Sequence, residues 1–256
     1  MDESRGYSPN GAIWNHQVVV IVPNNLLHTN FSSIWLTGDS NQNYEGNIKP
    51  GNYDILVGDA IAHNTRAICV VVKQVPNAPY IFPNDPDQRH RYEDSLLAWS
   101  WREFHDDVQN RTDWIVQLPM VKASYQAMRA VQEFVVEQKM AKIESWAVAG
   151  ASKRGWLCYL VAATECRGCG VNIGVITPLV PIVPDLLPDV HRMWQAYNGF
   201  TFAFQDYLQA GLAPYFDGEK LAQAWNIIDP INFLDRLENI PKFITVSSDD
   251  EFMMMD

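Results

Sequence analysis

The chain has 256 residues and a formal net charge of −11, from 19 basic and 30 acidic residues. This acidic balance argues against nucleic acid or an anionic membrane surface as a partner, because phosphate groups bind to basic surfaces. Hydrophobic residues make up 47% of the chain and aromatic residues 12%, which is enough apolar surface for a folded core. The apolar runs are of strand length, far below the roughly 20 residues of a transmembrane helix, and we expect no membrane span.

The first half of the chain shows three strand patterns and two helix patterns. Residues 16–24, 31–43 and 67–82 are β-branched apolar runs that end in Pro, Gly or Asn, as strands often do. Residues 92–108 and 118–139 repeat apolar side chains at helical spacing. The strands show little alternation of polar and apolar residues, which predicts burial on both faces of a mostly parallel sheet.

The second half continues the alternation of strands and helices. This order predicts a three-layer α/β sandwich, which we expect to form one domain over residues 1–256. The expected elements are a strand at 143–152, a helix at 153–165, a strand at 171–183, an aromatic-rich helical insertion or lid at about 185–238, and a last strand with its exit loop at 241–252.

The segment WAVAGASKRGW, residues 146–156, places Ser152 between the expected strand and the expected helix. A nucleophile elbow has a serine at such a corner, and small residues on both sides relieve the crowding of its backbone. Gly150 and Gly155 provide these small residues, but the spacing is G-x-S-x-x-G and Arg154 takes the usual second glycine position. The alternative is that Ser152 only caps a helix.

An acyl hydrolase also needs donors for an oxyanion. The backbone N–H of Lys153, at the helix start, is one candidate, and the loop around Gly38 and Asp39 is the other. The side chains of Lys153 and Arg154 are expected to be surface charges, although they could instead select an acidic substrate.

The serine would need a histidine as its base and a carboxylate to orient that histidine. Asp250 is the expected acid, with Asp249, Glu251 and Asp185 as alternatives, since all four follow expected strands. All six histidines precede Asp250, so the order Ser, acid, His of α/β-hydrolases is not completed. We therefore expect a fragment whose triad histidine is missing, and no metal or cofactor. The histidines are His16, His28, His63, His90, His105 and His191.

Cys166 and Cys169 form a single C-x-x-C pair. A zinc site would need a second pair of ligands, and a redox pair would open a helix after a strand. Ordinary core cysteines are favoured here, with a local disulfide or metal or redox chemistry as alternatives.

Several motifs together resemble one family. GASKRGW, EDSLLAWSWREF, DWIVQLPMVKASYQAMRAVQEF and PKFITVSSDDEF occur in the order seen in the PhoPQ-activated pathogenicity-related family, which includes an autocrine proliferation repressor. The resemblance implies an α/β-hydrolase-like fold with a helical insertion after the sixth strand, and a chain that continues past residue 256. It also implies export to an extracellular or periplasmic location. Ser152 matches the nucleophile position and Asp250 the Asp of the family's DEF segment, whereas TGDSNQN departs from the family's usual loop.

Two classes of function follow from this resemblance. In the first, the protein is an esterase or peptidase that acts on a small-molecule or peptide acyl substrate through Ser152. In the second, it is a secreted regulatory protein that keeps the hydrolase fold as a scaffold and binds a protein partner.

Overall fold

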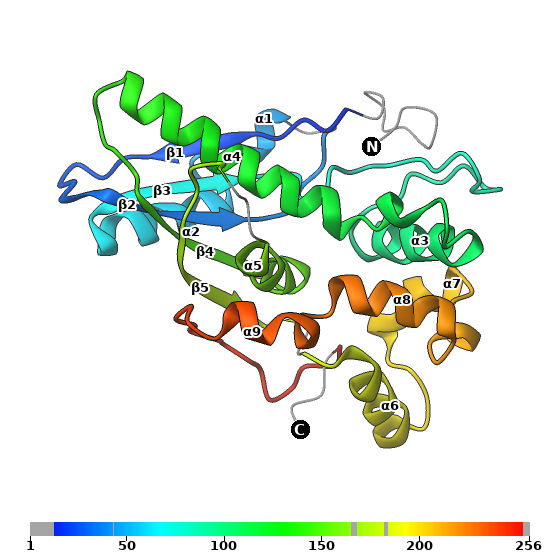
Figure 1. Cartoon of the computed structure of the whole chain (residues 1–256). Coiled ribbons are helices and arrows are strands. Elements are labelled where there is room, and N and C mark those ends of the chain that lie inside the picture. Colours follow the sequence, from blue (N-terminus) through cyan, green and yellow to red (C-terminus); the bar gives the residue numbers. More distant parts are fainter. Residues whose placement is uncertain (1–12, 43, 165–167, 182–183, 253–256) are drawn as a thin grey trace.

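The sheet lies on the left in Figure 1, with α3, α6, α7 and α8 to its right. The computed structural model describes residues 13–42, 44–164, 168–181 and 184–252. In this part of the chain five strands lie in the order β1-β3-β2-β4-β5, and β1 alone is antiparallel to its neighbour. The expected mostly parallel sheet is therefore confirmed. The strands are β1 (Val18–Ile21), β2 (His28–Leu36), β3 (Ala67–Val72), β4 (Ser145–Ala151) and β5 (Ile173–Leu179).

Helices cover both faces of this sheet and complete the three layers. Helices α4 and α5 pack on one face, while α2 packs against β1, β2 and β3 on the other. The helices are α1 (Tyr44–Asn47), α2 (Tyr53–Thr65), α3 (Glu93–Asp106), α4 (Gln117–Glu137), α5 (Lys153–Ala163), α6 (Leu186–Tyr197), α7 (Gln205–Gln209), α8 (Glu219–Ile228) and α9 (Leu234–Leu237).

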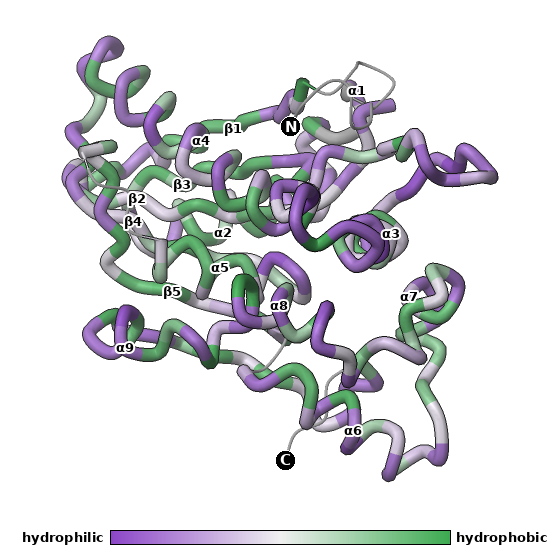
Figure 2. Tube along the Cα trace, turned by 45° about the vertical axis from the view of Figure 1, so that its right-hand side comes forward, coloured by the Kyte–Doolittle hydropathy of each residue, from purple (hydrophilic) through white to green (hydrophobic). Residues whose placement is uncertain are grey.

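The larger part of the core lies between the sheet and the α4–α5 layer. Trp146 on β4 and Trp156 on α5 are fully buried there. Figure 2 shows the strands and α5 as largely hydrophobic, with hydrophilic residues towards the outside. Burial of such aromatic side chains contributes about 1.5–3 kcal/mol each. Within the described residues, no helix has the length and apolar character needed to cross a membrane.

Helix α2 was not anticipated from the sequence. Its start is well marked, because the Asn52 side chain accepts a hydrogen bond from the backbone N–H of Asp54. Its fully buried residues are the small Gly58 and Ala62. The larger apolar residues that pack, partly buried, against the sheet are Ile55, Val57 and Ile61. A Cβ atom on Gly58 would lie 2.5 Å from Val71. Small residues let the helix approach closely but give little periodic signal.

The expected last strand at 241–252 is wrong as a continuous strand. Only two isolated parallel bridges form beside β5, Ile176 with Lys242 and Leu179 with Thr245. The backbone N–H of Thr245 still donates to the carbonyl of Pro178. Since Pro178 has no N–H to donate in return, the ladder is interrupted. The segment nevertheless runs parallel to β5 and reaches the same edge of the sheet.

The region from α6 to α9 is helical, as expected, and packs beside α3 and α5 (Figure 1). The indole N–H of Trp156 donates to the carbonyl of Ile228, 2.6 Å away. The aromatic residues of this region divide into two groups. Phe204 and Tyr207 are buried, whereas Trp194 and Phe202 are exposed.

Candidate active site

Ser152 lies directly between β4 and α5. Its backbone has φ 56° and ψ −122°, a conformation that side-chain-bearing residues rarely adopt. Ser152 is exposed, and its backbone N–H donates to the carbonyl of Leu179 at 2.9 Å. The side chain accepts no hydrogen bond from the start of α5. The alternative interpretation, a serine that only caps the helix, is therefore wrong.

The two glycines around Ser152 are required by close contacts. A Cβ atom on Gly150 would lie 2.6 Å from the Cβ of Arg154. One on Gly155 would lie 2.8 Å from the carbonyl oxygen of Leu179 and 3.1 Å from the Cα of Pro181. The close approach between α5 and the end of β5 is thus made at Gly155. This explains how Arg154 can occupy the usual second glycine position without obstructing the turn.

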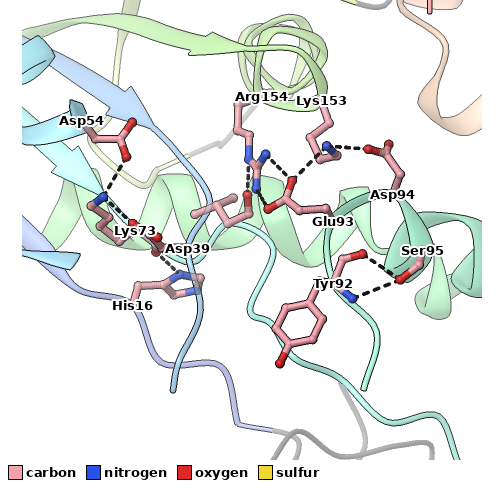
Figure 3. A network of polar contacts seen from close by, with 11 residues as sticks. His16, Asp39, Asp54, Lys73, Tyr92, Glu93, Asp94, Ser95, Lys153 and Arg154 are labelled. Carbon is pink, nitrogen blue, oxygen red and sulfur yellow. Dashed lines mark hydrogen bonds and ion pairs between the residues drawn. The ribbon is translucent and has the colours of Figure 1, made fainter. Parts of the chain in front are cut away.

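Arg154 and Lys153 were expected from the sequence to be surface charges, and this expectation is wrong. Both are only 7% exposed. The guanidinium of Arg154 makes two hydrogen bonds of 2.6 Å to the carboxylate of Glu93, and its Nε donates to the carbonyl of Val75 (Figure 3). Lys153 Nζ lies 2.9 Å from Glu93 Oε2 and 2.9 Å from Asp94 Oδ2. These four charged side chains are called the Glu93 cluster.

The Glu93 cluster connects the serine corner to α3 and to the helical insertion. Burial raises the pKa of Glu93, but the charges and hydrogen bonds of Arg154 and Lys153 outweigh it and lower that pKa to about 2. The hydroxyl of Tyr207, on α7, donates to Asp94 at 3.1 Å. The first turn of α3 is therefore fixed from three sides, which orients the helix start beside Ser152.

Gly38 lies at the same edge of the sheet as Ser152. Leu36 on β2 pairs with Gly150 on β4 in parallel register. Gly38 and Ser152 each come two residues after this pair, so both lie just beyond the carboxyl ends of their strands. A Cβ atom on Gly38 would lie 2.6 Å from Arg154 Nη2 and 2.6 Å from Glu93 Oε1. Only glycine leaves room for this ion pair, which places the backbone of the loop beside the serine corner.

The side chain of Asp39 is held in an ion pair. Its carboxylate lies 2.5 Å from Nζ of Lys73, a residue with no exposed side-chain surface. The same Nζ contacts Asp54 Oδ2 at 2.7 Å (Figure 3). It also donates to Asn52 Oδ1 at 2.8 Å. We call Lys73, Asp39 and Asp54 the Lys73 cluster. Asp39 can therefore serve an oxyanion only through its backbone.

The candidate acids follow β5 and the segment beside it. Asp250 Oδ1 accepts a hydrogen bond from the backbone N–H of Phe252 at 2.9 Å, and the carbonyl of Glu251 accepts one from Thr201. Asp249 is exposed. Asp185 has φ 77°, and its backbone N–H donates to Asp229. Residues 249–251 follow a segment parallel to β5, and this direction carries them to the carboxyl edge where Ser152 lies.

The six histidines have other surroundings. In the described part of the chain, none donates to or accepts from the Ser152 hydroxyl. His16 Nδ1 contacts the carbonyl of Lys73 at 3.0 Å, and burial lowers its pKa. His191 Nε2 lies 2.6 Å from Asp217. His28, at the start of β2, is at the opposite edge of the sheet from Ser152.

The cysteines divide into two kinds. Cys69 and Cys158 are buried and free, whereas Cys169 is disulfide-bonded. The favoured expectation of ordinary core cysteines is therefore wrong for Cys169, and Cys166 lies outside the described residues. Across the residues that the structure describes, no three His, Cys, Asp or Glu side chains are grouped as metal ligands would be.

Sequence reasoning missed the Lys73 cluster and the pairing within the Glu93 cluster. Lys73 stands directly after the apolar run AICVVV, and a lysine in that position was the available signal. Glu93 and Asp94 had been explained by the positive end of a helix. Their cations come from residues 153–154, some 60 positions away, and no local pattern connects them.

The arrangement of the sheet, the helices and the serine corner defines an α/β-hydrolase-like fold, and solved structures share it. An acetyl xylan esterase from Paenibacillus sp. R4 is 11% identical with a TM-score of 0.51, over 92% of this chain and 73% of that one. A mutant of the esterase rPPE is 12% identical with a TM-score of 0.51, over 98% of this chain and 68% of that one. At these identities the likeness concerns the fold alone.

The chain belongs to the PhoPQ-activated pathogenicity-related protein family, whose profile matches residues 4–256. Autocrine proliferation repressor protein A from Dictyostelium discoideum is 34% identical over 244 residues. That match covers 95% of this chain and 46% of the relative. The chain thus spans about half the length of the curated relative.

Proposed function

We propose that this chain carries the nucleophile of a serine acyl hydrolase, with Ser152 as the attacking residue. The observation that supports this most directly is the backbone of Ser152, which is held at φ 56° and ψ −122° with the residue exposed. A strained conformation persists only where its surroundings impose it, and such residues cluster at functional sites. Here the surroundings are the contacts of Gly150 and Gly155 and the buried ion pairs of Arg154.

In the proposed reaction, Ser152 Oγ attacks the carbonyl carbon of an ester or peptide substrate and gives its proton to the base. The C–O or C–N bond of the substrate then breaks, the alcohol or amine leaves with that proton, and water releases the acyl group from Ser152. The backbone N–H of Lys153, at the first turn of α5, points towards the developing oxyanion, since the first N–H groups of a helix have no partner within it. A backbone N–H of the Gly38–Asp39 loop provides the second donor. The side chains of Lys153 and Arg154 bind Glu93 and position this backbone.

The proposed base is a histidine from outside these 256 residues. The reason is that no histidine of the described structure is hydrogen-bonded to Ser152. Asp250 is the proposed acid that orients the base. It follows the segment parallel to β5, at the edge where the acid of such a site belongs.

A serine-directed fluorophosphonate tests the nucleophile in the full-length parent protein. We expect stoichiometric labelling that maps to Ser152 by peptide mass spectrometry and is lost in Ser152→Ala. Ser247→Ala, at another exposed serine, is the matched control and keeps the label. Labelling that persists in Ser152→Ala would contradict the assignment.

Asparagine variants test the acid. Asp250→Asn should lower kcat for a p-nitrophenyl ester by about 10³–10⁴-fold, the loss seen when a triad carboxylate becomes an amide. Asp249→Asn changes the exposed neighbouring carboxylate and should leave kcat within about twofold. Equal effects of the two substitutions would remove Asp250 from the triad.

The name of the Dictyostelium relative raises the alternative of a regulatory protein with a hydrolase fold as its scaffold. The Ser152→Ala variant separates the two. A biological effect that survives this substitution, in a protein that fluorophosphonate does not label, would replace the hydrolase proposal with the scaffold.

A further inference from the structure

A groove of about 490 Å³ is lined by residues of α4 and α5, of the end of α8, and of the segment that includes Phe233 and, on α9, Arg236. Its volume is within the range of about 300–1,000 Å³ for small-molecule sites. The part of α5 that lines it, Leu160 to Thr164, is at the far end of that helix from Ser152. At 1.5 Å per residue this corresponds to about 12–18 Å along the helix. The groove is therefore separate from the proposed active site.

The floor of the groove is apolar and packed. Val121, Tyr125, Leu160 and Ala163 line it and are each at most 9% exposed. The hydroxyl of Tyr125 lies 2.9 Å from the carbonyl of Val161 and 2.7 Å from that of Thr164. Burial raises the pKa of Tyr125 to about 12, which keeps it neutral. This floor can accept an alkyl chain, because it offers apolar surface and no unpaired polar group.

Three cationic side chains, Lys122, Arg129 and Arg236, stand around this floor, and no acidic residue is among the described residues that line the groove. The chain as a whole has 30 acidic and 19 basic residues, so the charge here opposes that of the molecule. Within the described structure, Lys122 and Arg129 form no ion pair or hydrogen bond. Arg236 donates one hydrogen bond, to the carbonyl of Ala163.

The two arginines lie towards one end of the groove, and Lys122 stands on α4 between Leu118 and Tyr125. The hydroxyl of Tyr125 contacts the carbonyl of Thr164, so this part of α4 lies beside the end of α5. Arg129 follows Tyr125 by one helical turn. Arg236 lies at the same end, since it contacts Ala163. Leu118 precedes Tyr125 by about two turns, at the other end. An occupant that matches this arrangement has an anionic head and an apolar tail.

We propose that this groove binds a single-chain anionic amphiphile, with a carboxylate between Arg129 and Arg236 and an alkyl chain over Val121, Leu160 and Leu118. The carboxylate receives charge-assisted hydrogen bonds from the guanidinium groups, and the chain covers the apolar floor. This site goes beyond the proposed hydrolase function and does not depend on it.

Isothermal titration calorimetry with sodium dodecanoate, below its micelle concentration, tests the site. We expect one bound molecule per chain and affinity at least about tenfold weaker in Arg129→Gln/Arg236→Gln, which loses both charged hydrogen bonds. The matched control is Lys139→Gln/Lys142→Gln, which removes two exposed cations elsewhere and keeps the affinity. Ser152→Ala also keeps it, so the result is independent of the active-site proposal.

Dodecyltrimethylammonium, which has the same tail and the opposite charge, should not bind. Equal binding of the two amphiphiles, or unchanged dodecanoate affinity in Arg129→Gln/Arg236→Gln, would show adsorption to apolar surface alone and overturn the proposal. Binding to phosphatidylglycerol vesicles without binding to monomeric dodecanoate would also overturn it, in favour of a membrane surface.

Discussion

Two ionic clusters with buried cations stand at the carboxyl edge of the sheet, and they differ in the number of cations that hold the carboxylates. In the Glu93 cluster two cations, Lys153 and Arg154, share two carboxylates. In the Lys73 cluster one fully buried cation holds both Asp39 and Asp54. A buried ion pair is costly to break because the remaining charge is left without its partner. If the first cluster loses one cation, a second cation still faces Glu93. If the second cluster loses Lys73, no cation of the cluster remains.

The largest effect is expected for Lys73→Met. The substitution leaves Asp39 and Asp54 close together without a cation, and we expect a loss of about 3–5 kcal/mol in the free energy of unfolding. Urea denaturation at pH 7 measures it. The control is Lys142→Met, whose side chain is 82% exposed and which should change stability by less than about 0.5 kcal/mol. A loss below about 1 kcal/mol for Lys73→Met would contradict the comparison.

Arg154→Met should cost less, about 2–3 kcal/mol, because Lys153 still faces Glu93 and lowers the usual cost of breaking a buried pair. The same urea experiment measures it. Arg154→Lys should recover only part of this loss, since an ammonium cannot make two parallel hydrogen bonds to the carboxylate. A larger loss in the free energy of unfolding for Arg154→Met than for Lys73→Met would show that Lys153 does not compensate for the missing guanidinium.

Glu93 provides a pH test of the first cluster. Its pKa is about 2 in the folded state against a usual value of 4.5, so the stabilisation is present above about pH 4.5 and is lost as pH falls towards 2. Because its side chain is 42% exposed, we expect a discounted effect of about 1–2 kcal/mol. Between pH 5.5 and 2, the wild type should lose that much more stability than Glu93→Gln. Glu144→Gln, at an exposed position, should follow the wild type, and a parallel profile for Glu93→Gln would refute the assignment.

The smallest effect is expected at Ser152, the strained residue that directly precedes Lys153 and Arg154 of the Glu93 cluster. Ser152→Gly should raise the free energy of unfolding by about 1 kcal/mol, because glycine adopts the observed backbone without strain. Ser152→Ala keeps the strain and should stay within about 0.5 kcal/mol of the wild type. Thermal unfolding of the three proteins checks this order. Equal stability of Ser152→Gly and Ser152→Ala would show that the corner carries no strain.

Much of the fold could be predicted from the sequence. Where the prediction failed, the cause is physical. Helix α4 was expected at residues 118–139 and occupies Gln117–Glu137, since a long apolar stripe encodes a helix strongly. Helix α2 was missed because its fully buried residues are the small Gly58 and Ala62, which give little periodic signal. The strand expected at 241–252 is reduced to two bridges beside Pro178, whose missing N–H affects a partner distant in sequence.

In the candidate site, too, some features could be predicted from the sequence and others could not. The corner at Ser152, with its two glycines, follows from a short local pattern, because crowding in a tight turn selects small residues at fixed spacing. The side chains of Lys153 and Arg154 were assigned wrongly to the surface. Whether a charged residue is buried depends on its partner, and here the partner Glu93 is on another helix.

By itself, the sequence determined most of the order of strands and helices, the position of Ser152 between a strand and a helix, and the membership of a family. Each of these depends on patterns within a few residues or on their order along the chain. Only the tertiary structure decided which charges are buried together, why Gly38 must be a glycine, and where an apolar groove meets three cations. Ionic pairing and close packing act across space, between side chains that no sequence interval relates.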